Sequence, residues 1–468
     1  MRVKHDICSL RFVWIAMVFG AAVFLGDSPC AADDTPKTIA TRNSTIAEQS
    51  DSGKYIGPGS CSSTSCHGSV TPRAETRVLQ NEYSTWVVKD KHSKAYSALT
   101  GVVGERMARI LKLGTAADHA PRCLGCHALY VPANQRGRVF DLNEGVSCES
   151  CHGPASGWLG PHTMRAWAHE QSIATGMADT RDLIHRTKKC LSCHLGSQEK
   201  FVDHGMIAAG HPDLYFELDS FSAVMPRHWN TPRMKAPGVP SEDGAWSGVR
   251  EWATGQAMQL NMGLERLAVR AQGKVWPEFS EMDCFACHHA LTSPEKSWRQ
   301  ERGYAGRRPG DPPWNASRYA VFQLVANQAD AAIAHELATQ LARLTELMSK
   351  PVPDREAVAT IAANAAPVAG KLAQRLENLQ FDQPTTLRLL QRISADEAGI
   401  SNQGERAAEQ AAMALDSLFV AYNKNVKPAN APELRTAING LFQQVESPSN
   451  YNPGDFARQM RKVNSLLR

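Results

Sequence analysis

Hydrophobic residues follow two different patterns along the chain, and the change falls near residue 315. From 315 to 468, apolar residues recur every three or four positions, and this spacing predicts amphipathic helices that bury one face. Breaks that contain proline separate several of them. We expect an α-helical bundle domain of four to six helices, at about 315–349, 353–379, 384–396, 402–424, 431–446 and 453–467.

Residues 55–301 are patterned differently. Helical spacing is predicted over 74–100, 103–113 and 246–272, but loops rich in Gly, Ser and Pro separate these segments, and few apolar runs are long enough to build a core. A Pro/Gly-rich stretch at 302–314 predicts a linker to the bundle. We therefore expect a mainly α protein with little regular sheet, in which a bound group completes the core of the first domain.

The N-terminus has the pattern of a secretory signal peptide over residues 1–32. A positively charged start precedes an apolar run from Phe12 to Gly26, and small residues follow, with cleavage expected after Ala32. The run of about fifteen residues is short for a spanning helix, and an uncleaved membrane anchor is the alternative. The polar residues 33–54 predict a flexible leader, and the protein is expected in the periplasm.

Composition and charge exclude one class of partner. The 468 residues carry a formal net charge of +4, and no basic run interleaved with aromatic residues occurs, so no nucleic-acid partner is expected. Of the 12 cysteines, Cys8 and Cys30 lie in the signal segment. The other ten form five pairs, and histidine directly follows each pair.

Four of these pairs have the spacing Cys-x-x-Cys-His, which is the attachment signature of c-type haem. Two thiols at this spacing reach the two vinyl groups of one porphyrin, and the following histidine ligates the iron as proximal ligand. The fifth pair, Cys61 and Cys66 before His67, has four intervening residues. Zinc sites, a redox dithiol and, for Cys61 and Cys66, a disulfide are the alternatives, but zinc does not require histidine after every pair.

The sequence therefore predicts five covalently attached haems c, which form much of the core of residues 55–301. The thioether cysteines are expected to be Cys61, Cys66, Cys123, Cys126, Cys148, Cys151, Cys190, Cys193, Cys284 and Cys287. The proximal iron ligands are expected to be His67, His127, His152, His194 and His288. Nine of the ten remaining histidines beyond the leader lie in the same part of the chain, which indicates that several are distal ligands.

The order and wording of the motifs between about 59 and 195 resemble the cytochrome c-554 family of tetrahaem cytochromes. In chain order, the shared features are a first haem motif, Trp86-x5-His92, RCLGCH, GVSCESCHGP with His162 ten residues after His152, and His185 five residues before Cys190. The family is known as the electron acceptor of hydroxylamine oxidoreductase. This chain departs from the family in its wider first motif, its fifth motif and its C-terminal helices, so that partner is not carried over.

The resemblance implies that most irons have two histidine ligands. It implies the distal ligands His162 for the first haem (His67), His92 for the third (His152) and His185 for the fourth (His194), and no protein ligand on the far side of the second haem (His127).

For the fifth haem (His288), we favour His211, then His204, then His228 as distal ligand. His204 and His211 are seven residues apart, which would place them on one helical face if Pro212 does not break the helix. His119, shortly before the second motif, is a candidate ligand or proton donor at the second haem. Met206 and Met225 are alternative axial ligands.

Closely packed haems with two histidine ligands predict an electron-transfer protein of low potential. The alternative is a multihaem oxidoreductase that acts on a small nitrogen or sulfur species at an open second haem, held by His127. Redox partner proteins are expected. The C-terminal bundle is interpreted either as a structural cap or as a docking surface in a membrane-associated redox complex.

Overall fold

The computed structural model describes residues 53–468 except 74, 77, 199, 230–243, 285–287, 289–313 and 448–449. The predicted signal peptide, the leader up to residue 52, residues 302–313 of the predicted linker and Cys287 lie outside the described residues.

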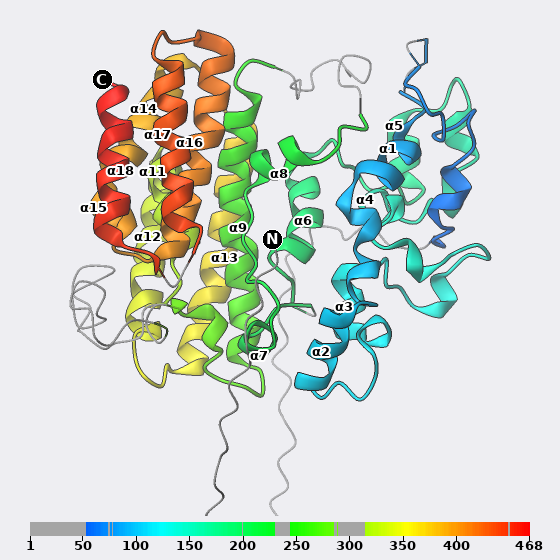
Figure 1. Ribbon diagram of the computed structural model, residues 1–468, viewed down its shortest axis with the longest axis horizontal. Helices are drawn as coiled ribbons and strands as arrows, with labels where there is room; N and C mark the ends of the chain where they lie inside the picture. The colour runs from blue at the N-terminus through cyan, green and yellow to red at the C-terminus, as the bar shows by residue number, and fades with distance from the viewer. Residues whose placement is uncertain are drawn as a thin grey trace, which may run out of the picture. The chain divides into compact units, whose positions relative to one another are not determined.

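The described chain is helical, and its only β pairing consists of two isolated bridges, Tyr55 with Arg136 and Met282 with Trp314 (Figure 1). The expected mainly α fold class is confirmed. In chain order, the helices are α1 (Glu82–Lys89), α2 (Val102–Ile110), α3 (Pro121–His127), α4 (Cys148–His152), α5 (His169–Ala174), α6 (Leu183–His194), α7 (His204–Ala208), α8 (Leu218–Val224), α9 (Ser247–Ala271), α10 (Ser317–Ala320), α11 (Gln323–Ala329), α12 (Ala331–Met348), α13 (Arg355–Glu377), α14 (Gln383–Ala395), α15 (Glu397–Ser401), α16 (Glu405–Val426), α17 (Ala431–Val445) and α18 (Pro453–Leu466). Short 3₁₀ turns lie between the early helices.

The helices of the C-terminal part follow the predicted ranges closely, with two divisions that the pattern did not reveal. The range 315–349 forms three helices. The last of them, α12, starts after Asp330, which is extended and whose carboxylate accepts from the amides of Ala332 and Ile333. The range 402–424 extends to α16 at Val426 and is preceded by the separate short helix α15.

The predicted helix over 74–100 is shorter than expected. Helix α1 ends at Lys89, because Asp90 has an extended backbone and its carboxylate accepts from the His92 amide at 3.0 Å. A 3₁₀ turn, Lys91–Lys94, follows. The direction of His92 is therefore set by this turn rather than by the face of α1.

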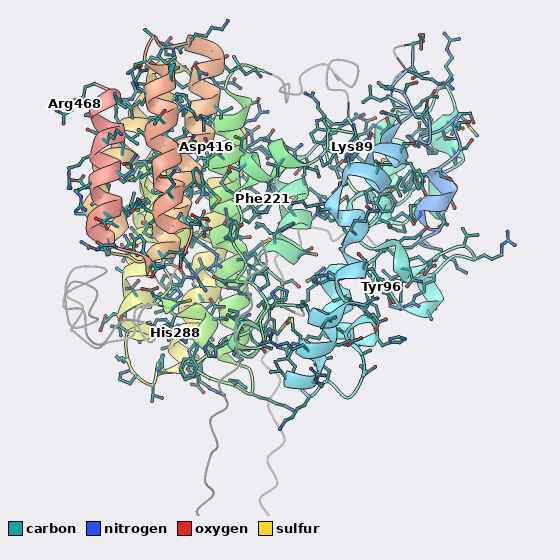
Figure 2. The ribbon with its side chains drawn as sticks, in the orientation of Figure 1. Lys89, Tyr96, Phe221, His288, Asp416 and Arg468 are labelled. Carbon is teal, nitrogen blue, oxygen red and sulfur yellow. The ribbon has the colours of Figure 1, made fainter. Side chains whose placement is uncertain are left out.

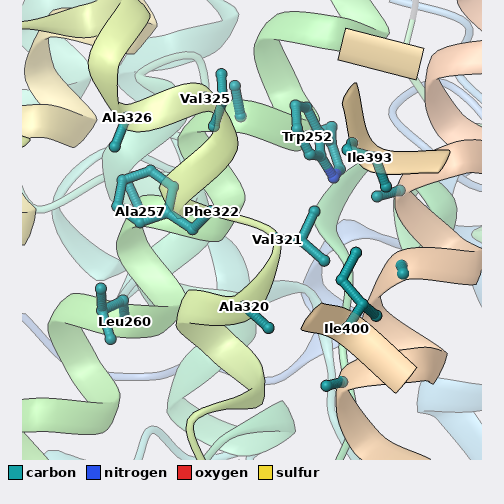
Figure 3. Packing of buried hydrophobic residues seen from close by; sticks show 14 of the residues in the cluster. Trp252, Ala257, Leu260, Ala320, Val321, Phe322, Val325, Ala326, Ile393 and Ile400 are labelled. Carbon is teal, nitrogen blue, oxygen red and sulfur yellow. The ribbon is translucent and has the colours of Figure 1, made fainter. Parts of the chain in front are cut away.

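Helix α9 is buried on nearly all sides, and Trp252, Ala257 and Met258 are at most 1% exposed. It packs against α13 and α16 and also against α6 and α8. Figure 3 shows Trp252, Ala257 and Leu260 beside Phe322 and Val325 in this core. The predicted division into two domains, 55–301 and 315–468, stays a prediction, but α9 shares one apolar core with segments on both sides of that division.

The N-terminal motif-bearing segment has only a small apolar cluster of its own in the described residues. The cluster consists of Leu99, Ala108, Ala117, Leu124 and Ala128. Such a cluster is too small to organise the loops between 53 and 163, which agrees with the expectation that bound groups complete this part.

Candidate haem centre

The second, third and fourth cysteine–histidine motifs adopt compact turns that bring their three functional side chains together. In α3 and α6, and throughout the short α4, the motif forms the last turn of a helix that ends at its histidine. Residues three and four apart lie on one face of a helix, so both thiols and the imidazole share that face. In the fifth motif, the His288 amide donates to the Cys284 carbonyl at 2.9 Å, as in a helical turn.

The wider first motif closes by a different route. The Cys61 carbonyl accepts from the His67 amide at 3.2 Å, although four residues separate Cys61 from Cys66. The Cys66 amide donates to the Ser63 carbonyl at 2.8 Å, so the extra residues form a local turn between the thiols. The insertion therefore leaves a closed loop that can present both cysteines.

Two of the alternatives to haem attachment, a disulfide and a metal site, have no counterpart in the described residues. The nine described motif cysteines are free thiols, so Cys61 and Cys66 form no disulfide. No group of three or more His, Cys, Asp or Glu side chains suited to a metal ion occurs in the described part of the chain.

Histidine rings from distant parts of the chain face one another in four pairs. The ring centres are 6.2 Å apart for His67 and His162, 6.0 Å for His92 and His194, 6.3 Å for His127 and His211, and 6.4 Å for His204 and His288. A bond of about 2 Å between metal and imidazole nitrogen on each side of one iron places two ring centres about 6 Å apart. The pairs thus have the spacing that two axial ligands of one haem require.

In five of these eight histidines, Nδ1 bonds to an acceptor, which would leave Nε2 free to bind a metal ion. His67 donates to Glu82 and His92 to Asp90, each at 2.9 Å. His162 donates to the Trp158 and Leu159 carbonyls. A hydrogen bond from Nδ1 to a carboxylate or carbonyl is the usual way in which proteins orient a metal-binding imidazole.

His152 and His185 are two further histidines that the sequence predicts as iron ligands. Burial, together with the nearby charges of His228 and His67, lowers the pKa of His152 to about 4, so the ring is neutral and has a free lone pair. Burial also lowers the pKa of His185. The buried Nε2 of His185 has no hydrogen-bond partner in the described residues, as expected of a nitrogen that binds a group outside the protein chain.

The observed pairing agrees with one expectation and differs from others. His162 lies beside His67, as expected. The ring of His92 faces that of His194, whereas the resemblance implies His92 as a ligand of the third haem and His185 as a ligand of the fourth. His194 is also flanked by Phe216 and by Phe221, at ring distances of 5.3 and 5.2 Å (Phe221 is labelled in Figure 2).

The fifth motif also differs from the expected order of candidates. His204 rather than His211 faces His288, whose position is labelled in Figure 2. His228 contacts Trp229 and donates to the Pro226 carbonyl at 3.1 Å. No sequence expectation placed His211 beside His127, although the structure brings their rings together.

The motifs contact one another through their cysteines. Cys61 lies within hydrogen-bonding reach of Cys148, and this contact together with burial raises the pKa of Cys148. Cys126 and Cys193 are in the same relation, and the Lys200 ammonium donates to Cys193 Sγ at 3.3 Å. Cys151 is close enough to Cys190 for their charges to interact. Haems attached at these positions would be near neighbours.

Buried carboxylates fix the relative positions of these motifs. Glu149, inside the third motif, accepts from the amides of Ile56, Gly57 and Ala155 at 2.7–2.9 Å and so holds the loop before the first motif. Glu281, just before the fifth motif, binds Arg266 and Arg270 of α9.

The two arginines of α9 reach further into the motif-bearing part of the chain. Arg266 donates to the Leu195 carbonyl, which directly follows the fourth motif. Arg270 donates to the Val202 carbonyl before α7 at 3.0 Å and lies 4.2 Å from the ring centre of Phe201. Helix α9 therefore sets the positions of the fourth motif, the fifth motif and α7 at once.

Comparisons with known proteins agree with this geometry over part of the chain. A family model described as cytochrome c554 and c-prime matches residues 60–153, which contain the first three motifs. The chain is 30% identical over 115 residues to cytochrome c-554 of Nitrosomonas europaea, which is 22% of this chain and 48% of that protein. The resemblance to the cytochrome c-554 family is confirmed. It indicates a c-type cytochrome with covalently bound haem c.

The chain spans about half the length of the curated relative it matches. No solved structure matches it. Among the described residues, no helix is both long enough and apolar enough to cross a membrane.

Proposed function

We propose that this chain is an exported pentahaem c-type cytochrome that carries electrons through closely packed haems with mostly two histidine ligands each. The observation that supports this most strongly is the set of four histidine ring pairs with centres 6.0–6.4 Å apart. When bound, haem c supplies an iron that exchanges one electron reversibly. The paired imidazoles serve such exchange, because they hold the same ligand geometry in both oxidation states.

The ring pairs support an assignment of one distal histidine to each of several motifs. His162 serves the first motif, His92 the fourth and His204 the fifth. For the third motif we propose His185, because its Nε2 is buried without a hydrogen bond in the described residues and its helix α6 contacts α4.

The cysteine contacts support an order of close haem neighbours. The first motif adjoins the third through Cys61 and Cys148, and the fourth adjoins the second through Cys193 and Cys126. The third and fourth motifs approach at Cys151 and Cys190. We propose that electrons follow this order, that the protein works in the periplasm, and that its partners are other redox proteins, with the C-terminal helices as a cap or docking surface.

Two measurements on the mature holoprotein test this proposal: its mass and the spin state of its irons. Five covalently attached haems and low-spin iron in the electron paramagnetic resonance (EPR) spectrum are expected. A mass with four haems would remove Cys61 and Cys66 from the attachment sites. A protein without covalent haem would refute the function itself.

A further inference from the structure

We propose that His211 is the distal ligand of the haem attached at Cys123 and Cys126, so that this second iron is closed to small molecules. This inference rests on the proposed function. The ring of His127 lies at the end of α3, and the ring of His211 faces it with centres 6.3 Å apart and planes at 87°. The separation falls within the 6.0–6.4 Å range of the other three histidine pairs.

Both rings are held in the tautomer that binds iron through Nε2. His127 Nδ1 donates to the Ala95 carbonyl at 2.9 Å, and His211 Nδ1 donates to the Pro212 carbonyl at 2.7 Å. A carbonyl oxygen can only accept, so each Nδ1 carries the proton and each Nε2 keeps its lone pair. Two such rings at this separation can ligate one iron from opposite faces.

The backbone after α7 explains why His211 does not serve the fifth haem. Helix α7 ends at Ala208, and Gly210 has a φ of 110°, a conformation that side chains other than glycine rarely adopt. The chain therefore leaves the helical path, and His204 and His211 do not share one face. His204 faces His288 and His211 faces His127, so one short segment supplies ligands to two irons.

Contacts at both ends hold this ligand-bearing segment in place. Asp203 caps α7 by accepting from the Met206 amide at 2.8 Å, and it forms an ion pair with Arg122, the residue before Cys123. The His211 amide donates to the Met206 carbonyl at 3.0 Å, and Met206 is 5% exposed. Asp213 forms an ion pair with Arg406 of α16. The segment is thus tied to the second motif and to the C-terminal helices.

The other candidate for this position, His119, is unsuited to it. Its side chain is 72% exposed and its Nδ1 bonds to Asp118, the preceding residue. The family model matches residues 60–153 and does not include His211. A second haem closed by His211 leaves no open iron there for an oxidoreductase reaction.

The test compares the full-length holoprotein with His211→Ala. The wild type is expected to contain no high-spin iron and to bind no carbon monoxide after reduction. His211→Ala should show one high-spin haem, bind one carbon monoxide per chain, and return to the low-spin spectrum when free imidazole is added. Rescue by imidazole separates a missing ligand from a damaged fold, because imidazole cannot repair misfolding.

Two further variants complete the design. His119→Ala should leave every spectrum unchanged, and His204→Ala should produce its own high-spin haem. A wild type that already holds one high-spin haem and binds carbon monoxide would overturn the inference, as would a His211→Ala spectrum that remains low-spin. Loss of the haem itself would instead count against the proposed function, and the mass measurement distinguishes the two.

Discussion

Replacing Glu281 with glutamine is expected to loosen the junction between α9 and two haem motifs. Its carboxylate accepts from Arg266 Nε and Nη2 at 3.0 and 3.1 Å and from Arg270 Nη1 at 2.6 Å. The Glu281, Arg266 and Arg270 side chains are 3%, 6% and 4% exposed. The neutral amide removes the negative charge but keeps the size of the side chain, so the change is electrostatic.

The magnitude follows from the burial of these three groups. Two opposite charges about 3 Å apart attract by roughly 5 kcal/mol at an effective dielectric constant of about 20, and desolvation offsets much of this. Removing one partner leaves the guanidinium groups buried without a counter-charge, which costs about 3–5 kcal/mol. Local opening should therefore become roughly 10²- to 10⁴-fold more frequent.

Hydrogen exchange of the full holoprotein, resolved by peptide mass spectrometry, measures this opening directly. Faster exchange is expected in peptides covering 195–204 and 275–284, whereas 431–466 should be unaffected. Glu346→Gln is the matched control, because Glu346 and Arg343 form a pair that is 61% and 57% exposed, and such pairs contribute at most about 1 kcal/mol. Equal effects of the two substitutions would refute the electrostatic reasoning.

The ion pairs of Glu281 also make the stability of this junction depend on pH, in a direction that follows from the pKa of Glu281. Burial alone raises the pKa of Glu281, but Arg266 and Arg270 outweigh it and bring the pKa to about 2, below its ordinary value of 4.5. Since the folded pKa is the lower one, the stabilisation is complete above about pH 4.5 and is lost as the pH falls toward 2. Its size is about 3 kcal/mol. Exchange protection should decline in that window in the wild type and not in Glu281→Gln.

Three other substitutions test separate features. His162→Ala should leave one high-spin haem and remove a rhombic EPR signal, because its ring is within 8° of parallel to that of His67; an unchanged spectrum would contradict the pairing. Glu82→Gln should raise the potential of the first haem by about 60 mV in spectroelectrochemistry, since His67 loses a carboxylate acceptor; no shift would argue against that ligand role. Trp252→Ala should cost about 3–5 kcal/mol in the same exchange experiment, against at most about 0.5 kcal/mol for the 49% exposed Val420→Ala; similar costs would contradict the burial of α9.

Local features of this protein were predictable from the sequence. The range 246–272 became α9 at Ser247–Ala271, and 353–379 became α13 at Arg355–Glu377, because the spacing of apolar residues carries this information within one segment. The capping carboxylates of Asp90 and Asp330 were visible in the sequence, but their ability to end a helix depends on local backbone geometry.

The partners of the histidines were much less predictable. His92 and His194 are far apart in the chain, and which ring meets which depends on how α6 packs, a property that no local pattern records. The same holds for His127 and His211. Carboxylates in the sequence gave one usable signal for which histidines are oriented by a hydrogen bond at Nδ1. Asp90 lies only two residues before His92, and Glu82, at the start of α1, follows His67 in the chain.

The burial of α9 limits how this chain can be divided into independent parts. A chain cut between the two predicted domains would expose Trp252 and Met258 to water on one fragment, and on the other it would remove the surface against which α13 packs. Neither fragment would keep a complete interior. The C-terminal helices are therefore part of the structural core on which the N-terminal, motif-bearing part depends. Deleting the C-terminal helices or the motif-bearing part is expected to destabilise the remaining part.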